Sequence, residues 1–264
     1  MRSEMGKGES MGVAGKNHDS PKILILSDIH GNYEALKALR EDYDELWVLG
    51  DLVNYGPQPA EVIDFVRENA SLVVRGNHDD AVAFHRDPRC SKPFRRAAQE
   101  TQMYTESVLS EKDKEYLADL PHYRWVRRGD TTFYVCHAAP SDPLYVYRPA
   151  DDPQWGMEVS KAGTDCLFVG HTHLQFTSRI DDQLVVNPGS LGQAKTGTPE
   201  AKYATWENGV IRLNSRAYMV EKTVARVRAM PVSEDTKEFL IRILETGSVP
   251  KITQERAHAE DQRT

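Results

Sequence analysis

Apolar residues in the first part of the chain fall into short runs, which are separated by segments with helical spacing. Strand-length runs occupy 23–27, 46–49 and 71–74. Between them, 32–40 and a helix opened by Pro59 carry apolar residues three or four positions apart, which predicts one buried face on each helix. Strands that alternate with amphipathic helices pair in parallel through right-handed crossovers, so the pattern predicts an α/β sheet.

The middle of the chain, residues 80–128, shows a helical pattern instead. Residues 94–109 are largely helical in their spacing. Ser110 and Asp113 have the spacing of a capping box, which starts a second helix that ends before Pro121. We therefore expect 80–128 to form a helical insert between strands of the sheet.

Strand patterns return after the insert. Apolar runs at 131–136, 165–169 and 184–186 predict three further strands. Asn208-Gly209 suits a two-residue type I′ turn, and the alternating segments on either side of it predict a β-hairpin. Residues 233–244 are expected to form a last helix.

The two ends of the chain lack this patterning. Residues 1–20 contain no apolar core of a secretory signal, and we expect a disordered tail there. The polar residues 251–264 are expected to fray. The remainder, 21–250, is predicted to be a single domain that carries the insert. Whether 1–20 belongs to the mature protein stays open.

Composition narrows the class of protein further. Of the 264 residues, 39% are hydrophobic and 28% are charged, which is typical of a globular chain. The formal net charge of −7 excludes a generally basic nucleic-acid binder. No apolar run approaches the length of a membrane span. Three cysteines without a C-x-x-C spacing favour a reducing cytoplasm, and we interpret Cys90, Cys136 and Cys166 as buried packing.

Metal-ligand residue types follow five of the predicted strands, in the first residues of each loop. Because the carboxyl ends of strands in open α/β sheets converge on the ligand crevice, we expect these side chains to meet. Glycines beside them allow tight turns. One such segment alone would be an ordinary turn or helix cap, but five are hard to obtain from packing alone. The segments are S-D-I-H-G-N at 27–32, G-D at 50–51, G-N-H-D at 76–79, C-H-A at 136–138 and G-H-T-H at 170–173.

The chemistry of these side chains indicates the kind of ion. Two Asp, one Asn and four His offer oxygen and imidazole donors without a thiolate, which suits Mn²⁺, Fe, Co²⁺, Ni²⁺ or Zn²⁺. Seven ligands exceed one tetrahedral zinc site but fit two ions that share a carboxylate. Such a site generates a hydroxide at neutral pH and stabilises in-line displacement at phosphorus. The remaining histidines, His18, His85, His122 and His258, receive no role.

The ordered series D-x-H, G-D, G-N-H-D, H and G-H-T-H resembles the calcineurin-like metallophosphoesterases, which include phosphatases, phosphodiesterases and some nucleases. The resemblance spans 23–192, and N-P-G-S at 187–190 is similar to the small prokaryotic members. It implies a four-layer α/β/β/α sandwich of two mixed sheets flanked by helices. It also implies two divalent transition-metal ions, for which we predict manganese.

The resemblance assigns a role to each matching residue. Asp28, His30 and His173 would hold the first ion. Asn77, His137 and His171 would hold the second, with Asp51 bridging both. His78 would stabilise the developing charge or protonate the leaving oxygen. Asp79 would orient the loop or the His78 ring, and Asn32 and the turn at 187–190 are candidates to support the ligands or contact phosphate.

One departure from the family concerns phosphate binding. Protein serine/threonine phosphatases of this family have an Asp and a phosphate-clamping Arg where this chain has Asn54 and Tyr55. Tyrosine cannot form a bidentate fork to phosphate, which disfavours a protein phosphatase and favours phosphodiesters or small substrates. Asn54 remains a candidate partner of His78. Arg75 is a candidate phosphate contact or a structural ion pair.

Substrate choice is expected to lie around the insert. Tyr145, Tyr147 and Arg148 are candidates to stack a nucleobase or to pack the loop. A cluster of basic residues either offsets phosphate charge or forms a solvated helix face. Its members are Arg86, Arg89, Lys92, Arg95 and Arg96.

The sequence thus predicts a cytoplasmic binuclear phosphoesterase that hydrolyses phosphodiester bonds of small molecules or nucleotides. The alternatives are a dinucleoside polyphosphate hydrolase or a broad phosphomonoesterase. A scaffold subunit of the same fold is disfavoured by the complete ligand set. The acidic balance disfavours extended nucleic acid as a partner, and no membrane partner is expected. The native substrate, the physiological metal and homo-oligomerisation stay open.

Overall fold

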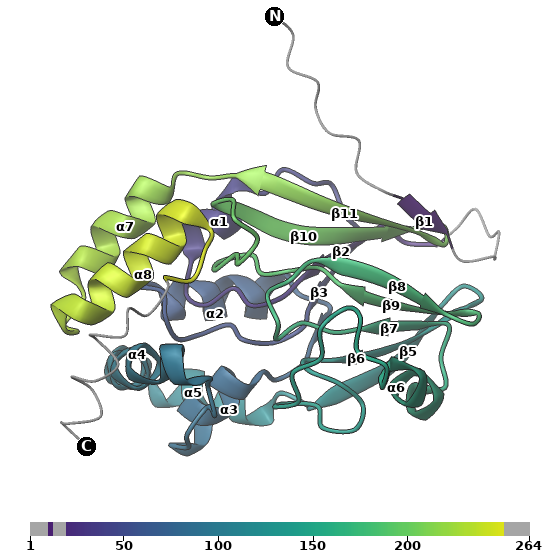
Figure 1. Cartoon of the computed structure of the whole chain (residues 1–264), viewed down its shortest axis with the longest axis horizontal. Coiled ribbons are helices and arrows are strands. Elements are labelled where there is room, and N and C mark those ends of the chain that lie inside the picture. Colours follow the sequence, from purple (N-terminus) through teal and green to yellow (C-terminus); the bar gives the residue numbers. More distant parts are fainter. Residues whose placement is uncertain (1–9, 13–19, 251–264) are drawn as a thin grey trace, which may run out of the picture.

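The computed structural model describes residues 10–12 and 20–250, which form two β-sheets packed face to face with helices on their outer faces (Figure 1). Buried side chains of both sheets fill the space between them, including Trp47, Phe133, Phe168 and Trp206. The predicted four-layer α/β/β/α arrangement is confirmed.

The first sheet has the strand order β1-β11-β10-β2-β3-β4, in which β2, β3 and β4 are parallel and the other neighbours antiparallel. Asn208 and Gly209 have positive φ angles of 49° and 79°, as the predicted hairpin turn between β10 and β11 requires. The strands are β1 (Ser10–Gly12), β2 (Ile23–Leu26), β3 (Glu45–Val48), β4 (Leu72–Val73), β10 (Glu200–Glu207) and β11 (Val210–Ala217).

The second sheet has the order β5-β6-β7-β9-β8, with β6, β7 and β9 parallel. Its two edge strands, β5 and β8, pair antiparallel with their neighbours. Five of the parallel strands of the two sheets, β2, β3, β4, β6 and β7, lead into the segments that carry the predicted ligands. The strands are β5 (Tyr123–Arg128), β6 (Thr131–Cys136), β7 (Cys166–Phe168), β8 (Phe176–Ile180) and β9 (Gln183–Asn187).

Three helices cover the first sheet and one covers the second. Helices α1 (Tyr33–Ala38), α2 (Pro59–Asn69) and α5 (Glu111–Asp119) pack their apolar residues against β2 and β3. Helix α6 (Trp155–Ala162) packs against the outer face of the second sheet. Pro59 occupies the first turn of α2, as predicted, because a proline there forfeits no helical hydrogen bond.

A helical cap lies beside one end of the sandwich (Figure 1). The backbone N–H and the hydroxyl of Ser233 both donate to the Glu100 carboxylate, with 2.8 Å from the nitrogen to Oε2. These hydrogen bonds join the insert to the C-terminal helices. An apolar cluster with Tyr55 and Phe94 lies between them. The cap contains α3 (Asn77–Phe84), the 3₁₀ turn η1 (Lys92–Phe94), α4 (Arg95–Val108), α7 (Val220–Ala229) and α8 (Glu234–Thr246).

The predicted boundaries differ from the structure at two places. The helical part of the insert ends at Asp119, and Tyr123–Arg128 is the edge strand β5. Its residues are largely exposed, and Tyr123, Trp125 and Val126 do not alternate regularly with the arginines. Residues 10–12, inside the predicted tail, pair with β11. The rest of the tail and 251–264 lie outside the described residues. Strand β8 and helices α6 and α7 were not predicted.

Candidate metal centre

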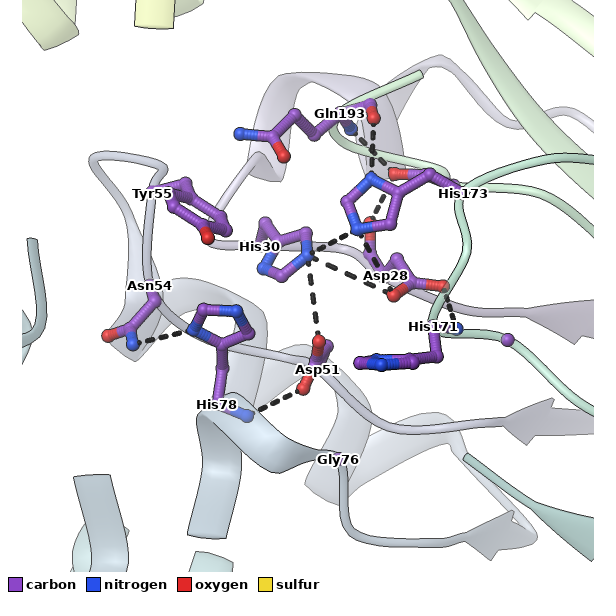
Figure 2. Close-up of polar contacts among 12 residues, drawn as sticks. Asp28, His30, Asp51, Asn54, Tyr55, Gly76, His78, His171, His173 and Gln193 are labelled. Atoms are coloured by element: carbon purple, nitrogen blue, oxygen red, sulfur yellow. Dashed lines mark hydrogen bonds and ion pairs between the residues drawn. The ribbon is translucent and has the colours of Figure 1, made fainter. Parts of the chain in front are cut away.

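The seven predicted ligands converge at the carboxyl ends of parallel strands from both sheets. Figure 2 shows five of them, Asp28, His30, Asp51, His171 and His173. The loops after β2 and β3 supply the carboxylates, and α3 begins at Asn77 directly after the β4 loop. The loops after β6 and β7 supply His137, His171 and His173. Two sets of these side chains are close enough to hold an ion: Asp28 with His30 and His173, and Asp51 with His137 and His171.

The backbone around the centre is left-handed at residues other than glycine. Such φ angles are uncommon for side chains with a Cβ and persist only where the surrounding structure enforces them. Five of the seven ligands have them, and so do the two residues Asn54 and Tyr55. The five ligands are Asp28 (φ 52°), His30 (48°), Asp51 (55°), His171 (65°) and His173 (61°).

Glycines allow these loops to approach one another. A Cβ on Gly76 would collide with the side chain and backbone nitrogen of Asp51. A Cβ on Gly170 would collide with the hydroxyl of Ser27 and come within 2.9 Å of the Asp28 carboxylate. The glycines of the sequence pattern are therefore required by space and not only by turn geometry.

The first ligand group is Asp28, His30 and His173. The Nδ1 atoms of the two rings donate to the carbonyls of Val53 and Gln193, at 3.0 and 2.7 Å. Their Nε2 atoms, which then carry no hydrogen, face each other at 3.2 Å. Burial lowers the pKa of His30 to about 4, so its ring is neutral at pH 7. Two lone pairs at this distance repel unless a cation lies between them.

Asp28 completes this group with an oxygen that has no partner. Its Oδ2 accepts from the His171 backbone N–H, whereas Oδ1 is buried without a hydrogen bond and lies 3.4 Å from His173 Nε2. Burial together with the nearby Asp51 carboxylate raises the pKa of Asp28 to about 6. A cation would remove both the unpaired oxygen and the repulsion.

The second group is His137, His171 and Asn77. His137 Nδ1 donates to the Leu49 carbonyl at 2.8 Å, which leaves Nε2 facing His171 Nδ1 at 3.2 Å and Asn77 Oδ1 at 3.1 Å. The Asn77 amide nitrogen donates to the Pro88 carbonyl, so its oxygen is turned toward the group. Backbone carbonyls therefore orient ligands in both halves.

Asp51 lies between the two groups. Its Oδ2 is 3.7 Å from His30 Nε2 and 3.3 Å from His137 Nε2, while Oδ1 accepts from the His78 backbone N–H at 2.9 Å. Burial raises the pKa of Asp51, but His137, His78 and His30 outweigh burial and hold it well below its usual value. One ionised oxygen facing both groups is what a bridging ligand requires.

The donors present fit two divalent ions. They are oxygen and imidazole atoms, and the inward-facing ring nitrogens of His30 and His173 carry no hydrogen. Cys136 and Cys166 are fully buried in the core, as predicted, and contribute no thiolate to either group.

His78 and Asp79 have different positions in the site. Asp79 accepts from the backbone N–H groups of Asp51, Leu52 and Gly76, at 2.8, 2.8 and 2.9 Å. It therefore holds the loops and does not contact the His78 ring. Asn54 instead donates to His78 Nδ1 at 2.9 Å, which leaves the hydrogen of that ring on Nε2.

His78 Nε2 lies 3.4 Å from the thiol of Cys90. Burial lowers the pKa of His78 to about 3, against the opposing effect of Asp51, so the ring is a neutral hydrogen-bond donor. Cys90 is only partly buried and touches this ring and the Tyr55 hydroxyl. Cys90 packs against the apolar cluster of the cap, as predicted, but it is less buried than predicted and its thiol also faces the site. Nothing in the local sequence pattern distinguishes it from the two core cysteines.

Asn32 and Arg75 are engaged away from the ligands. Asn32 caps α1 and also holds Gly192 and Thr223, at 2.9 Å each. Arg75 donates to the Ala118 carbonyl, contacts the His122 ring at 2.7 Å and pairs with Asp80 at 3.6 Å. Of the two interpretations of Arg75, the contacts favour the structural ion pair.

The turn at 187–190 supports the ligand loops. Asn187 donates to the Gly170 carbonyl at 2.7 Å, and Ser190 Oγ donates to the Asp28 carbonyl at 2.8 Å. These bonds favour a supporting role over direct contact with phosphate. The same loop continues to Lys195, which the sequence analysis did not single out. A lysine in a glycine-rich turn that follows a ligand-supporting motif is the signal that could have found it.

The aromatic loop after His137 divides into buried and exposed parts. Tyr147 is 54% exposed and its ring lies 6.1 Å from that of His171. The guanidinium of Arg89 lies over the Tyr145 ring at 4.2 Å. Arg148 is buried and paired with Glu158, so it is engaged in the fold. In the basic cluster, Arg86 and Arg96 pair with acidic neighbours.

Comparison with known proteins agrees with this geometry. The profile of the calcineurin-like phosphoesterase superfamily domain matches residues 22–208. The chain belongs to this superfamily. This confirms the predicted class of enzyme, a metal-dependent phosphoric ester hydrolase.

Individual relatives cover different shares of the chain. A metallophosphoesterase structure from Sphaerobacter thermophilus is 29% identical with a TM-score of 0.72, covering 87% of this chain and 100% of that one. An uncharacterized protein of Methanocaldococcus jannaschii is 28% identical over 208 residues, which are 70% of this chain and 82% of that protein. A symmetrical bis(5'-nucleosyl)-tetraphosphatase of Hamiltonella defensa is 31% identical over 168 residues, 57% of this chain and 56% of that enzyme.

Within residues 10–12 and 20–250, no helix is both long and apolar enough to span a membrane.

Proposed function

We propose that the protein hydrolyses phosphate esters of small molecules or nucleotides at a binuclear metal centre. The observation that carries this proposal is the position of Asp51 Oδ2 between two groups of ring nitrogens, 3.7 Å from His30 and 3.3 Å from His137. Two bound divalent ions would supply a nucleophile from water at neutral pH and offset charge on the phosphoryl oxygens.

The side chains of this protein divide the remaining tasks. Asp28, His30 and His173 would hold one ion, and Asn77, His137 and His171 the other, with Asp51 shared. His78, as a neutral donor through Nε2, would stabilise charge that develops on an oxygen at phosphorus, provided that this oxygen displaces the Cys90 thiol. Asp79 and Asn54 would position the loops and the His78 ring.

Phosphodiesters are the substrates that the sequence favoured. A dinucleoside polyphosphate is the second candidate, because the Hamiltonella defensa relative bears that activity in its name and an exposed Tyr147 lies beside His171. Manganese as the physiological metal and a cytoplasmic location stay predictions.

Metal analysis and a small substrate panel test the proposal. The full chain, loaded with manganese, should contain two ions per chain and hydrolyse bis(p-nitrophenyl) phosphate, p-nitrophenyl phosphate or diadenosine tetraphosphate. Removal of metal by a chelator should abolish the activity, and added manganese should restore it. A metal-loaded chain that holds one ion, or that hydrolyses none of the three compounds, would contradict the proposal.

A further inference from the structure

Lys195 lies beside the metal centre, and no described residue forms an ion pair with its ammonium group. It stands two positions after Gln193, whose carbonyl accepts the ring hydrogen of the ligand His173. The side chain is partly buried, and its ammonium forms no hydrogen bond or ion pair with another residue of 10–12 or 20–250. Its one ring contact is with Phe94, 4.4 Å from the nitrogen to the ring centroid.

A row of aromatic rings leads from this ammonium to the centre. The ring of Phe94 lies 6.0 Å from that of Tyr55, which in turn lies 4.9 Å from His30 and 4.7 Å from His78. Phe94 and Tyr55 thus connect Lys195 to the first ligand group and to His78. The anionic and ionisable groups that act on it are Asp28, Cys90 and Asp51.

The charge of Lys195 is poorly compensated. Burial lowers its pKa to about 8, and the neighbouring carboxylates offset this only in part. Contact with one aromatic ring is worth about 2 kcal/mol for a desolvated cation, which is less than the several kcal/mol that withdrawal of an ammonium from water costs. Once two divalent ions neutralise Asp28 and Asp51, these carboxylates no longer offset the charge of the Lys195 ammonium. An anion is then needed beside Lys195.

Three arginines near the site are paired with carboxylates, and Arg89 lies over the Tyr145 ring. Arg75 pairs with Asp80, Arg86 also pairs with Asp80, and Arg96 pairs with Glu100 and Asp235. The Tyr55 hydroxyl contacts Cys90 and carries no charge. Lys195 is therefore a cation that the described residues leave without an ion pair, and Asp28 and Asp51 act on its charge.

We infer that Lys195 binds a phosphate oxygen of the substrate, and that this substrate carries more negative charge than the single charge of a phosphodiester. The inference rests on the proposed function and names its substrate class. Two aspartates, a hydroxide and a singly charged diester together balance the charge of two divalent ions. The positive charge of the Lys195 ammonium then has no negative charge to balance it. A terminal phosphate with two charges, or the neighbouring phosphate of a polyphosphate, supplies the missing negative charge.

Substitution of Lys195 tests this preference. The manganese-loaded variants Lys195→Met and Lys195→Arg are compared with the wild type and with Lys161→Met, which removes an exposed lysine of α6. The measurements are metal content, the dissociation constant of orthophosphate by calorimetry, and kcat/KM for three substrates. Bis(p-nitrophenyl) phosphate has one charge, p-nitrophenyl phosphate has two at its end, and diadenosine tetraphosphate has its charges along a chain.

Lys195→Met should weaken orthophosphate binding about 10- to 100-fold, as expected for the loss of a hydrogen bond to a charged group. It should change kcat/KM for the diester by less than about threefold, with two ions still bound. Lys195→Arg should restore most of the binding. A similar loss in kcat/KM for p-nitrophenyl phosphate indicates a terminal phosphate, and a loss confined to diadenosine tetraphosphate indicates a neighbouring one.

Three results would overturn the inference. These are equal losses for the diester and the more highly charged substrates, a fall in metal content in Lys195→Met, and orthophosphate binding that the substitution leaves unchanged. Hydrolysis without any dependence on Lys195 would leave the proposed function standing. Orthophosphate binding that depends on Lys195 in a chain without hydrolase activity would instead refute the proposed function alone.

Discussion

The two halves of the candidate metal centre present similar side chains but differ in what covers them. In the first half, Asp28, His30 and His173 are at most 3% exposed, and the Tyr55 ring and the loop through Gln193 lie over them (Figure 2). In the second half His137 is fully buried, but His171 is only partly buried and lies beside an exposed Tyr147.

The two halves thus share their ligand chemistry but differ in how accessible they are to a substrate. Both halves obtain their ligands from strand ends and orient them with backbone carbonyls, so the chemistry repeats. Access depends on segments outside the strand pattern, namely the insert, the loop after β9 and the loop after β6. A substrate should therefore approach beside His171, with its charged end toward His78 and Lys195.

The largest effect is expected from Asp51→Asn, which breaks both halves at once. Loss of the shared charge should lower kcat by at least about a thousandfold, a barrier increase of about 4 kcal/mol. Metal content should fall below two ions per chain, as measured by elemental analysis. Asp182→Asn, in an exposed turn, serves as the control. Full activity of metal-replete Asp51→Asn enzyme would refute the shared-ligand assignment.

His78→Ala tests the closed half without removing a ligand. In its proposed role His78 stabilises charge on an oxygen, so kcat should fall about 10²–10³-fold for phenyl phosphate, whose leaving group is poor. The fall should be smaller for p-nitrophenyl phosphate, because its leaving oxygen carries charge more readily.

The control for this variant is His85→Asn at the exposed end of the same helix, where asparagine tolerates the left-handed backbone. Both variants should keep two ions per chain. If His78→Ala loses an ion, our assignment of His78 is wrong.

Tyr147→Ala tests the open half. If a nucleobase stacks on this ring, KM for diadenosine tetraphosphate should rise about tenfold, since a stacked base contributes about 1–3 kcal/mol. Inhibition by orthophosphate, which has no base, should not change. Tyr147→Phe keeps the ring and should behave as the wild type. An unchanged KM in Tyr147→Ala would place the nucleoside elsewhere.

The smallest effect concerns the cap that closes the first half. Burial raises the pKa of Glu100, but hydrogen bonds from Ser233 and the Arg96 ion pair outweigh it and lower the value to about 2. The folded-state pKa is thus below the ordinary value of 4.5. Glu100 therefore stabilises the protein above about pH 4.5, and this contribution is lost as the pH falls toward 2.

Glu100→Gln should accordingly lower the free energy of unfolding at pH 7 by about 1 kcal/mol, because the site is partly exposed to solvent. Urea unfolding at several pH values measures this, and the difference from the wild type should shrink below pH 4.5. Glu68→Gln, on the exposed face of α2, is the control. A difference that stays constant down to pH 2 would show that the carboxylate charge is not responsible.

Much of the fold followed from local pattern. Pro59 opened α2, Ser110 and Asp113 form the predicted capping box, and Asn208-Gly209 turned the hairpin, because each signal acts within a few residues. Strand β5 was missed because an exposed edge strand needs no regular alternation of apolar residues. The pairing that defines it comes from β6, a partner that local sequence does not specify.

In the candidate site, too, some features follow from local sequence and others depend on long-range contacts. The ligand types and their glycines are written in five short segments, because metal chemistry and tight turns place strict demands on residue identity. Which nitrogen of each ring faces inward depends on carbonyls such as Val53 and Leu49 from other loops. The contact of Cys90 with His78 depends on how the insert folds back, so no local pattern predicted it.

The sequence by itself determined the superfamily, the two-sheet fold and the seven candidate ligand positions, since these depend on residue type and order. Only the tertiary structure decided that Asp79 holds loops, that Arg75 is engaged by Asp80, and that Lys195 keeps an unpaired charge beside the centre. The physical reason is that hydrogen bonds and charges act through space, and long-range folding chooses which polar groups meet.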